Sequence, residues 1–151
     1  MIEFVLFIVI IVPISLFWHE LGHLLGAKLM RATHITLTIG TGKPILKWTF
    51  NNMTFIINRL FIFHSLTETN SFHTLSKKDK FVITLMGPIS SLLLSFITFC
   101  FDIFLFNNVI LVYASLFNLW LGIVNLLPFK INEKQSDGYT ILQIIKMNVE
   151  Q

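Results

Sequence analysis

Charged residues are scarce in this sequence, and their scarcity decides its class. Only 13% of its 151 residues are charged, whereas a soluble domain carries about 25%. Hydrophobic residues make up 54% of the chain, and 16 of them are phenylalanine. A soluble core of this length cannot bury so much apolar surface. We therefore expect lipid to be the main solvent and residues 1–151 to form a single membrane-embedded domain.

The sequence also lacks a second cysteine, a basic N-terminal region and a signal-peptidase site. A single cysteine, Cys100, cannot form a disulfide within the chain. Because it lies in an apolar run, we interpret it as a small buried hydrophobic residue. Residues 1–17 are apolar but have no Ala-x-Ala-like cleavage site, and the apolar character continues past His23. We expect a retained transmembrane helix here rather than a signal peptide.

Three apolar stretches are long enough to span a bilayer. They cover about residues 4–29, 81–101 and 109–129, and the last two contain no charged residue. Each reaches the ~20 residues that a ~30 Å hydrocarbon core requires. Pro13 could kink the first stretch, and Asn107-Asn108 predicts a tight turn between the second and third. Small residues at helical spacing predict close packing of the second and third stretches: Thr84, Gly87, Ser91 and Ser95, then Ser115, Asn118, Gly122 and Asn125.

The loop over residues 31–80 predicts β-structure. Apolar and polar residues alternate over 35–39, 46–50 and 53–57, and Asn51-Asn52 suits a two-residue hairpin turn. Gly40–Pro44 predicts a turn, and a short amphipathic helix is expected from Asp137. The predicted fold is thus an all-α transmembrane core of three spanning helices, with a small cytoplasmic β-hairpin or sheet inserted between the first and second.

The basic residues predict the orientation. Eight of the eleven lysines and arginines lie between Lys28 and Lys80, and the other three follow the third stretch. By the positive-inside rule the N-terminus faces outside, and the loop and the C-terminus face the cytoplasm. The net charge of +3 is then explained by orientation and contact with lipid headgroups, not by nucleic-acid binding. We expect an integral protein of the bacterial plasma membrane.

One motif carries chemistry, His19-Glu20-Leu21-Gly22-His23, at the end of the first apolar stretch. Two histidines four residues apart on a helix point the same way, so both imidazoles can reach one Zn²⁺. Glu20 then lies beside the metal as a general base for its water. A buried polar packing network is the alternative. Ionisable groups are expensive inside a membrane, however, which favours a functional role.

A catalytic zinc site usually has a third protein ligand. Glu133 and Asp137 follow the third stretch at the level where the two histidines of the motif are expected. Asp137 is preferred, because Gly138 lets the backbone turn closely past a metal site, and Glu133 stays the alternative. The other histidines are interpreted as solvated or structural: His34 at the start of a strand, and His64 and His73 in polar loop sequence.

In their order, these motifs resemble those of the site-2 protease family of zinc intramembrane metalloproteases. That family has HExxH in its first core helix, Gly-Pro in the second, and Asn-x-x-Pro followed by Asp-Gly at the third. The matching residues are His19–His23, Gly87-Pro88, Asn125–Pro128 and Asp137-Gly138. This chain also departs from the family pattern, and a Pro-x-Gly-Gly element that the family often has after its cytoplasmic strands is absent around residues 59–64. Ser91 stands where Asn is frequent, and residues 130–135, interpreted as a surface loop, lengthen the interval between Asn125 and Asp137.

The resemblance implies a zinc-dependent endopeptidase that hydrolyses a peptide bond in or near a transmembrane segment of a membrane protein or hydrophobic peptide precursor. It implies His19, His23 and Asp137 as zinc ligands and Glu20 as the catalytic base. Asn125 is expected either to bind the oxyanion or substrate, or to hydrogen-bond another helix. The competing hypotheses are a catalytically inactive adaptor of the same fold, disfavoured by the intact Glu20, and a transporter, disfavoured by the lack of an inverted repeat.

Overall fold

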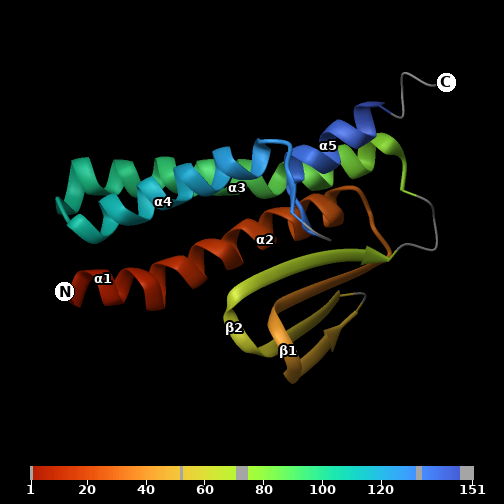
Figure 1. The fold of residues 1–151 in the computed structure, drawn as a ribbon, viewed down its shortest axis with the longest axis horizontal. Coiled ribbons are helices and arrows are strands. Elements are labelled where there is room, and N and C mark those ends of the chain that lie inside the picture. The colour runs from red at the N-terminus through yellow and green to blue at the C-terminus, as the bar shows by residue number, and fades with distance from the viewer. Residues whose placement is uncertain (1, 52, 71–74, 132–133, 147–151) are drawn as a thin grey trace.

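The computed structural model describes residues 2–51, 53–70, 75–131 and 134–146, without the side chains of residues 34, 41, 60–70 and 106. A long interrupted helix is followed by a two-stranded sheet, two further long helices, a small hairpin and a final short helix (Figure 1). Three helices are long and apolar enough to cross a membrane, namely Ile2–Leu29, Lys77–Leu105 and Val109–Leu126. The three predicted spans are therefore confirmed by length and composition.

The first span has three parts, α1 (Ile2–Leu6), η1 (Phe7–Ile11) and α2 (Val12–Leu29). In the π-helical segment η1 each backbone hydrogen bond reaches one residue further than in an α-helix. Pro13, in the first turn of α2, has no N–H to donate. The irregularity predicted at Pro13 therefore takes the form of a change in helix type directly before it.

The second span consists of α3 (Lys77–Phe101) and η2 (Asp102–Phe106). It begins at Lys77 rather than at the predicted residue 81, because Ser76 and Asp79 form a capping box. The Ser76 hydroxyl accepts a hydrogen bond from Asp79 N at 3.1 Å, and the Asp79 carboxylate accepts one from Ser76 N at 2.9 Å. These two bonds satisfy backbone donors that the start of a helix otherwise leaves unpaired.

The third span is α4 (Val109–Leu126), which ends before the predicted residue 129. Leu127 is extended, with φ −71° and ψ 132°, because the ring of Pro128 disfavours helical geometry in the residue before it. The predicted turn ahead of α4 is confirmed. Asn107 has a positive φ of 45°, and the Asn108 side chain accepts a hydrogen bond from Ile110 N at 2.9 Å.

The sheet consists of β1 (His34–Phe50) and β2 (Met53–Asn70). Its hairpin turn is confirmed, since Phe50 pairs with Met53 and Asn51 has a φ of 53°. Residues 35–39 lie between two parts of β2, pairing with 65–69 on one side and 53–57 on the other. Among the described residues, 46–50 and 65–70 are thus the outer segments of the sheet.

Two loop predictions in this region are wrong. Residues 40–44, predicted as a turn, belong to β1, which bends where Gly40 and Gly42 have φ of 83° and 95° and where its pairing partner changes. Residue 64, predicted to lie in a loop, is part of β2, because the chain continues to residue 70 by pairing with residues 34–39. The predicted roles of the histidine side chains at positions 34, 64 and 73 are not tested, because the structure does not describe the side chains of His34 and His64 or any part of His73.

A hairpin of β3 (Lys130–Ile131) and β4 (Lys134–Gln135) separates α4 from α5 (Asp137–Lys146). It replaces the predicted surface loop, and α5 begins where the sequence predicts. Beyond the hairpin, Ser136 N donates to Phe129 O at 3.0 Å and Phe129 N donates to Ser136 Oγ at 3.1 Å. The chain therefore returns to the end of α4 before α5 starts.

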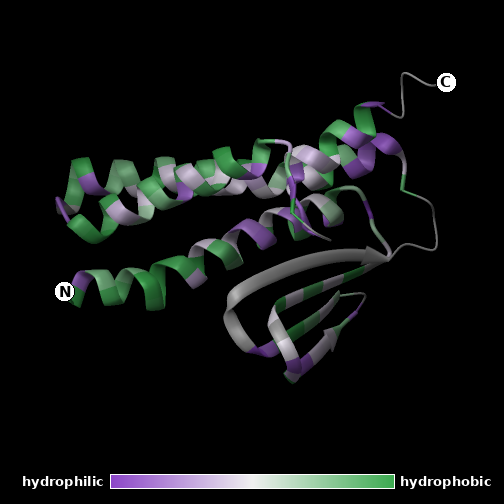
Figure 2. Ribbon diagram, in the orientation of Figure 1, coloured by the Kyte–Doolittle hydropathy of each residue, from purple (hydrophilic) through white to green (hydrophobic). Residues whose placement is uncertain are grey.

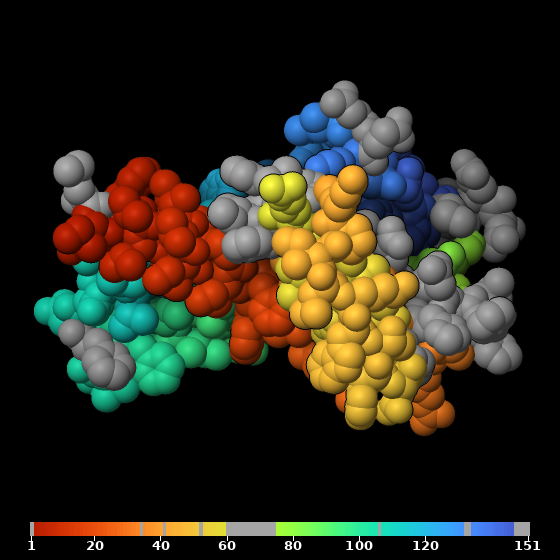
Figure 3. Space-filling view, turned by 90° about the horizontal axis from the view of Figure 1, so that it is seen from below, coloured from red at the N-terminus to blue at the C-terminus, as the bar shows by residue number. Residues whose placement is uncertain are grey.

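The helices and the sheet pack in layers. α3 and α4 lie side by side, α2 runs along α3, and the sheet stands on the opposite side of α2 (Figure 1). A buried apolar core joins the end of α2 to β1 and α3 through Leu24, Ala27, Ala32, Ile35, Leu37 and Ile83. Seen from below, the sheet forms a lobe beside the first span (Figure 3). This layering places the last turns of α2 between α3 and the sheet.

The helices carry apolar side chains outward as well as inward. Phe4 is 64% exposed, Phe96 64% and Phe104 78%, and all three lie in the candidate spans. Figure 2 shows the spans mostly in hydrophobic colours, with hydrophilic residues within α2 and at the start of α3. Lipid contact accounts for outward-facing apolar side chains of this kind. The hydrophilic group within α2 is the candidate site.

Candidate metal centre

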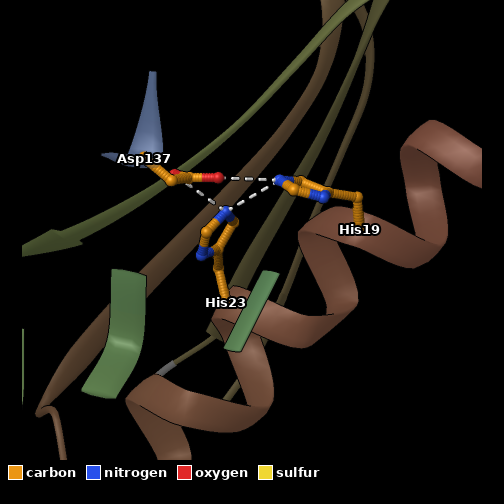
Figure 4. Close-up of side chains that lie close together, drawn as sticks. All are labelled: His19, His23 and Asp137. Carbon is orange, nitrogen blue, oxygen red and sulfur yellow. Dashed lines mark hydrogen bonds and ion pairs between the residues drawn. The ribbon is translucent and has the colours of Figure 1, made fainter. Parts of the chain in front are cut away.

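The histidines of the HExxH motif and Asp137 meet at one point (Figure 4). His19 and His23 lie on one face of α2 with their Nε2 atoms 3.2 Å apart. Asp137, the first residue of α5, stands opposite. Its Oδ2 is 3.1 Å from His19 Nε2, and its Oδ1 is 3.4 Å from His23 Nε2. The structure thus brings the three predicted ligands together from distant parts of the chain.

Ser136 places Asp137 at this point. The buried Ser136 hydroxyl donates to Leu127 O at 2.6 Å and accepts from Tyr139 N at 3.1 Å. The second bond caps the start of α5, so one side chain fastens α5 to the end of α4. Gly138 is required there because the end of α4 lies against it. A Cβ at Gly138 would overlap the carbonyl of Leu126.

Each imidazole is also held through its other ring nitrogen. His23 Nδ1 donates to Ile83 O at 2.9 Å, and His19 Nδ1 forms a 2.9 Å hydrogen bond with the fully buried Ser91 hydroxyl. The carbonyl of Ile83 can only accept, so His23 carries its proton on Nδ1. Such partners fix the ring orientation and tautomer of metal-binding histidines. Both Nε2 atoms are thereby turned toward Asp137.

The polar atoms of the three residues are close enough to share a zinc ion. Two ligands about 2.0–2.1 Å from a tetrahedral zinc lie about 3.3 Å apart. The two Nε2 atoms are 3.2 Å apart, and Asp137 approaches His19 with Oδ2 at 3.1 Å and His23 with Oδ1 at 3.4 Å. In its neutral form, with the proton on Nδ1, His23 has a lone pair on Nε2 that can bind a metal ion. Two imidazoles and one carboxylate with a fourth position open are a typical ligand set of catalytic zinc sites.

The carboxyl group of Asp137 is in the form that binds a metal. Burial by itself would raise its pKa, but hydrogen bonds and charge interactions with His19 and His23 outweigh burial. The pKa of Asp137 therefore lies below its ordinary value of 3.8, and the group is ionised at neutral pH. Within the described part of the chain, His19, His23 and Asp137 are the group placed closely enough to share a metal ion.

The two predicted catalytic side chains lie in different surroundings. Glu20 is buried on α2 and interacts electrostatically with His23. Asn125, in the last turn of α4, donates from Nδ2 to Leu121 O at 2.9 Å, which is a bond within its own helix. Its role in catalysis stays a prediction. Glu133, the alternative third ligand, lies outside the described residues.

Gly87 makes room for His23. A Cβ on this residue of α3 would overlap the His23 imidazole. Pro88, which follows it, is fully buried. The glycine of the Gly-Pro motif therefore has a steric role at the site, because it allows α3 to approach the ligand-bearing face of α2.

Sequence reasoning missed the roles of Ser91 and Ser136. Ser91 is interpreted from its spacing as a small residue at a helix contact, and its hydrogen bond to His19 depends on how α2 and α3 are aligned. The available signal was its place three residues after Pro88, where the site-2 protease family often has an asparagine. Ser136 gave a weaker one, since a serine directly before a predicted helix is a common N-cap.

Replacing Ser91 by alanine is expected to weaken zinc binding by about 10–100-fold, the usual effect of removing a partner that orients a metal ligand. The loss should appear as a higher zinc dissociation constant in a competition titration against a chelating dye. Ser90→Ala is the matched control, because Ser90 donates to Gly87 O at 2.7 Å and to Trp18 O at 3.2 Å in the same helix interface. Equal zinc affinity in Ser91→Ala and Ser90→Ala would contradict the role assigned to Ser91.

Comparisons with known proteins bear on the same residues. A family model described as Peptidase family M50 matches residues 6–109, a range that includes the HExxH motif, Gly87 and Ser91 but ends before Asp137. A protein of Borreliella burgdorferi named "Putative zinc metalloprotease" is 29% identical over 117 residues. That alignment covers 65% of this chain and 27% of the relative. The chain thus spans about a quarter of the length of that relative.

Proposed function

The chain belongs to peptidase family M50, the site-2 protease family, and on this premise we propose that it is a zinc-dependent intramembrane endopeptidase. The proposed substrate is a membrane protein or hydrophobic peptide precursor, cut in or near a transmembrane segment. One observation carries the proposal. One possible ligand atom from each of His19, His23 and Asp137 lies within 4.8 Å of the other two, and the two histidines belong to a helix apolar enough to span a membrane.

The residues around the site divide the chemical work. A zinc ion held by His19, His23 and Asp137 supplies a Lewis acid that activates water and polarises the scissile carbonyl. Glu20 takes the proton of the attacking water and later delivers it to the leaving amine. Asn125 has a second amide N–H beyond the one given to Leu121, and we assign it to the oxyanion of the tetrahedral intermediate.

The substrate has to be unwound before it can be cut, because a membrane helix keeps its carbonyls in internal hydrogen bonds. An unwound segment can be held as an additional strand at the edge of a sheet. The outer segments of the β1–β2 sheet, residues 46–50 and 65–70, are candidates for this contact among the described residues. β2 passes beside α2 (Figure 1), which supports this assignment.

We also propose that the N-terminus faces outside and that the sheet and C-terminus face the cytoplasm. Most lysines and arginines lie between the first and second spans or after the third, which supports this orientation. The site lies toward the C-terminal end of α2. In this orientation water reaches it from the cytoplasmic side.

The test of this proposal is the metal content and hydrolytic activity of detergent-purified protein. We expect about one zinc per chain in the wild type, and a sharp loss of zinc in His23→Ala and in Asp137→Ala. Asp102→Asn is the matched control, because Asp102 accepts a hydrogen bond from Asn108 N at the opposite end of the spans. Hydrolysis is followed with reporter peptides, each about 20 apolar residues long with fluorophore and quencher flanking a central Asn-Gly pair that weakens the helix.

Each other result points elsewhere. No zinc in the wild type would reject the protease and favour the inactive adaptor of the same fold. Loss of zinc in His23→Ala but not in Asp137→Ala would keep the enzyme and make Glu133 the third ligand. Zinc without cleavage of any reporter peptide would leave a metal protein that is not this kind of protease.

A further inference from the structure

Asn118 is the most unusual buried side chain outside the metal centre. It lies in α4 with 1% of its surface exposed, and its Nδ2 donates to Ser15 Oγ and to Ala114 O, both at 2.8 Å. The carbonyl of Ala114 can only accept, so the amide orientation is fixed and the remaining atom is Oδ1. Among the described residues, Asn118 Oδ1 is the buried side-chain oxygen or nitrogen with no hydrogen-bond partner.

A buried acceptor without a partner destabilises a protein, and more so where no water is at hand. Leucine has about the same size and would not carry this cost. An asparagine at this position therefore lowers the stability of the folded state, and a role in packing does not explain why it is there. Its free oxygen suits a ligand that brings a hydrogen-bond donor, such as the N–H of a peptide backbone.

The contact between α2 and α4, where Asn118 lies, is built differently from the other two helix contacts. α2 meets α3 at Gly22 and α3 meets α4 at Gly122, each with less room than a Cβ needs. By contrast, the first span meets α4 through the Asn118–Ser15 hydrogen bond and through Phe7, whose ring lies 5.9 Å from Tyr113 and 5.5 Å from Phe117. We call this contact between the first span and α4 the seam.

The first span also has an interruption next to the seam. Phe7 belongs to the π-helical segment η1, and Pro13 follows in the first turn of α2. Interruptions of this kind are the usual places where a helix bends. A bend at this interruption would move the end of the first span that carries Phe7 relative to α4. Ser15 would not move with it, because it belongs to the same helix α2 as His19 and His23.

The seam leads to the metal centre. Ser15 lies one helical turn before His19 on the same face of α2, and α2 and α4 run in the same direction (Figure 1). Asn118 lies seven residues before Asn125, which is about 10 Å along the helix axis. An extended chain covers that distance with about three residues. A substrate lying in the seam with its scissile bond at the metal would thus pass Asn118 about three residues away.

We propose that Asn118 is a substrate-positioning residue, whose Oδ1 accepts a backbone N–H of an unwound substrate segment that enters between α2 and α4. The inference rests on the proposed function and adds to it the path and one anchoring contact of the substrate. Closed, the seam is joined by Ser15 and Asn118. The substrate contact uses Asn118 Oδ1, so Nδ2 can keep its hydrogen bonds to Ser15 Oγ and Ala114 O.

The test pairs changes in the protein with changes in the substrate. In the wild type, N-methylation of one backbone amide about three residues from the cleaved bond should lower kcat/KM for a reporter peptide by about tenfold, the worth of one hydrogen bond. In Asn118→Leu, kcat/KM should already be lowered, and the same N-methyl group should have no further effect. Ser115→Ala is the control, because Ser115 is buried on α4 but pairs with Ser95 on α3. It should keep both the activity and the sensitivity.

Thermal unfolding and zinc content separate this role from a structural one. Asn118→Leu should keep its zinc and unfold at the same temperature as the wild type or higher, because the unpartnered oxygen is gone. A lower unfolding temperature with an undiminished N-methyl effect would overturn the inference. If the leucine variant fails to fold, Asn118→Ala replaces it in both measurements. The inference would also be overturned if the wild type tolerated N-methylation equally at every position of the reporter peptide.

Binding measurements can test the role of Asn118 even if the proposed protease function fails. If the wild type cleaves no reporter peptide, the protease proposal fails. The N-methylated series can then be titrated against zinc-loaded wild type and Asn118→Leu by fluorescence anisotropy. Loss of affinity at one amide in the wild type alone would uphold the role of Asn118 in binding. Equal affinities throughout would reject it.

Discussion

Replacing Glu20 by glutamine is expected to lower hydrolysis of the reporter peptides by about 10²–10⁴-fold, the usual contribution of a general acid–base. Glutamine has the shape of glutamate but cannot take a proton from water. The three ligands are untouched by this change, so zinc content should remain that of the wild type. Steady-state cleavage rates and metal content, measured on the same samples, should show a loss of hydrolysis without a loss of zinc.

Glu3→Gln is the matched control, because Glu3 lies in α1 at the opposite end of the first span. It should cleave at the wild-type rate. Cleavage by Glu20→Gln within a factor of about ten of wild type would show that another group handles the proton. Loss of zinc together with activity would assign Glu20 to the metal centre as a ligand or its support. An adaptor without catalysis would keep its partner binding in both variants.

A single methyl group at Gly87 is expected to abolish zinc binding with all three ligands intact. The Cβ of alanine would occupy the space of the His23 imidazole. His23 must then rotate out of the position it shares with His19 and Asp137. We expect zinc affinity to fall by at least about 100-fold, the upper end of what disturbing a ligand's support usually costs, as measured by competition with a chelating dye.

Gly122→Ala separates this local effect from general damage to packing. Its Cβ would press on the Leu92 side chain at 2.8 Å and lie 3.2 Å from Pro88 O, between α3 and α4, with no ligand side chain among its nearest neighbours. Gly122→Ala should lower the unfolding temperature but keep zinc, whereas Gly87→Ala should fold and lose zinc. Normal zinc affinity in Gly87→Ala would mean that His23 has another rotamer able to reach the metal.

The spans and the hairpin turn could be predicted because they depend on local sequence. Apolar runs of spanning length, Asn51-Asn52 and Asn107-Asn108 each act over a few residues. The ends of the helices required finer detail, as when Pro128 forces Leu127 out of α4. The course of β2 could not be foreseen, since its residues after 63 become a strand only by pairing with residues 34–39.

The site shows the same division between near and distant effects. Two histidines four residues apart specify their own relative position, and the order of motifs predicts Asp137 as the third ligand. Ser91, Gly87 and Ser136 act through contacts between separate elements, which sequence spacing does not encode. Asn118 is a further case. As one of a row of small and polar residues in α4 it predicts packing, and its unpartnered oxygen is visible only once Ser15 and Ala114 are in place.

The hairpin between α4 and α5 bears on how proteins of this kind are found. Hydrogen bonds join Phe129 to Ser136 across the base of this hairpin. Insertions or deletions between these two residues would therefore leave Asp137 in place. Insertions and deletions should therefore accumulate at this point among homologues, while the serine that closes the hairpin persists. A search pattern that demands a fixed interval between Asn-x-x-Pro and Asp-Gly would overlook such chains. One that allows a variable interval ending in Ser-Asp-Gly would retrieve them.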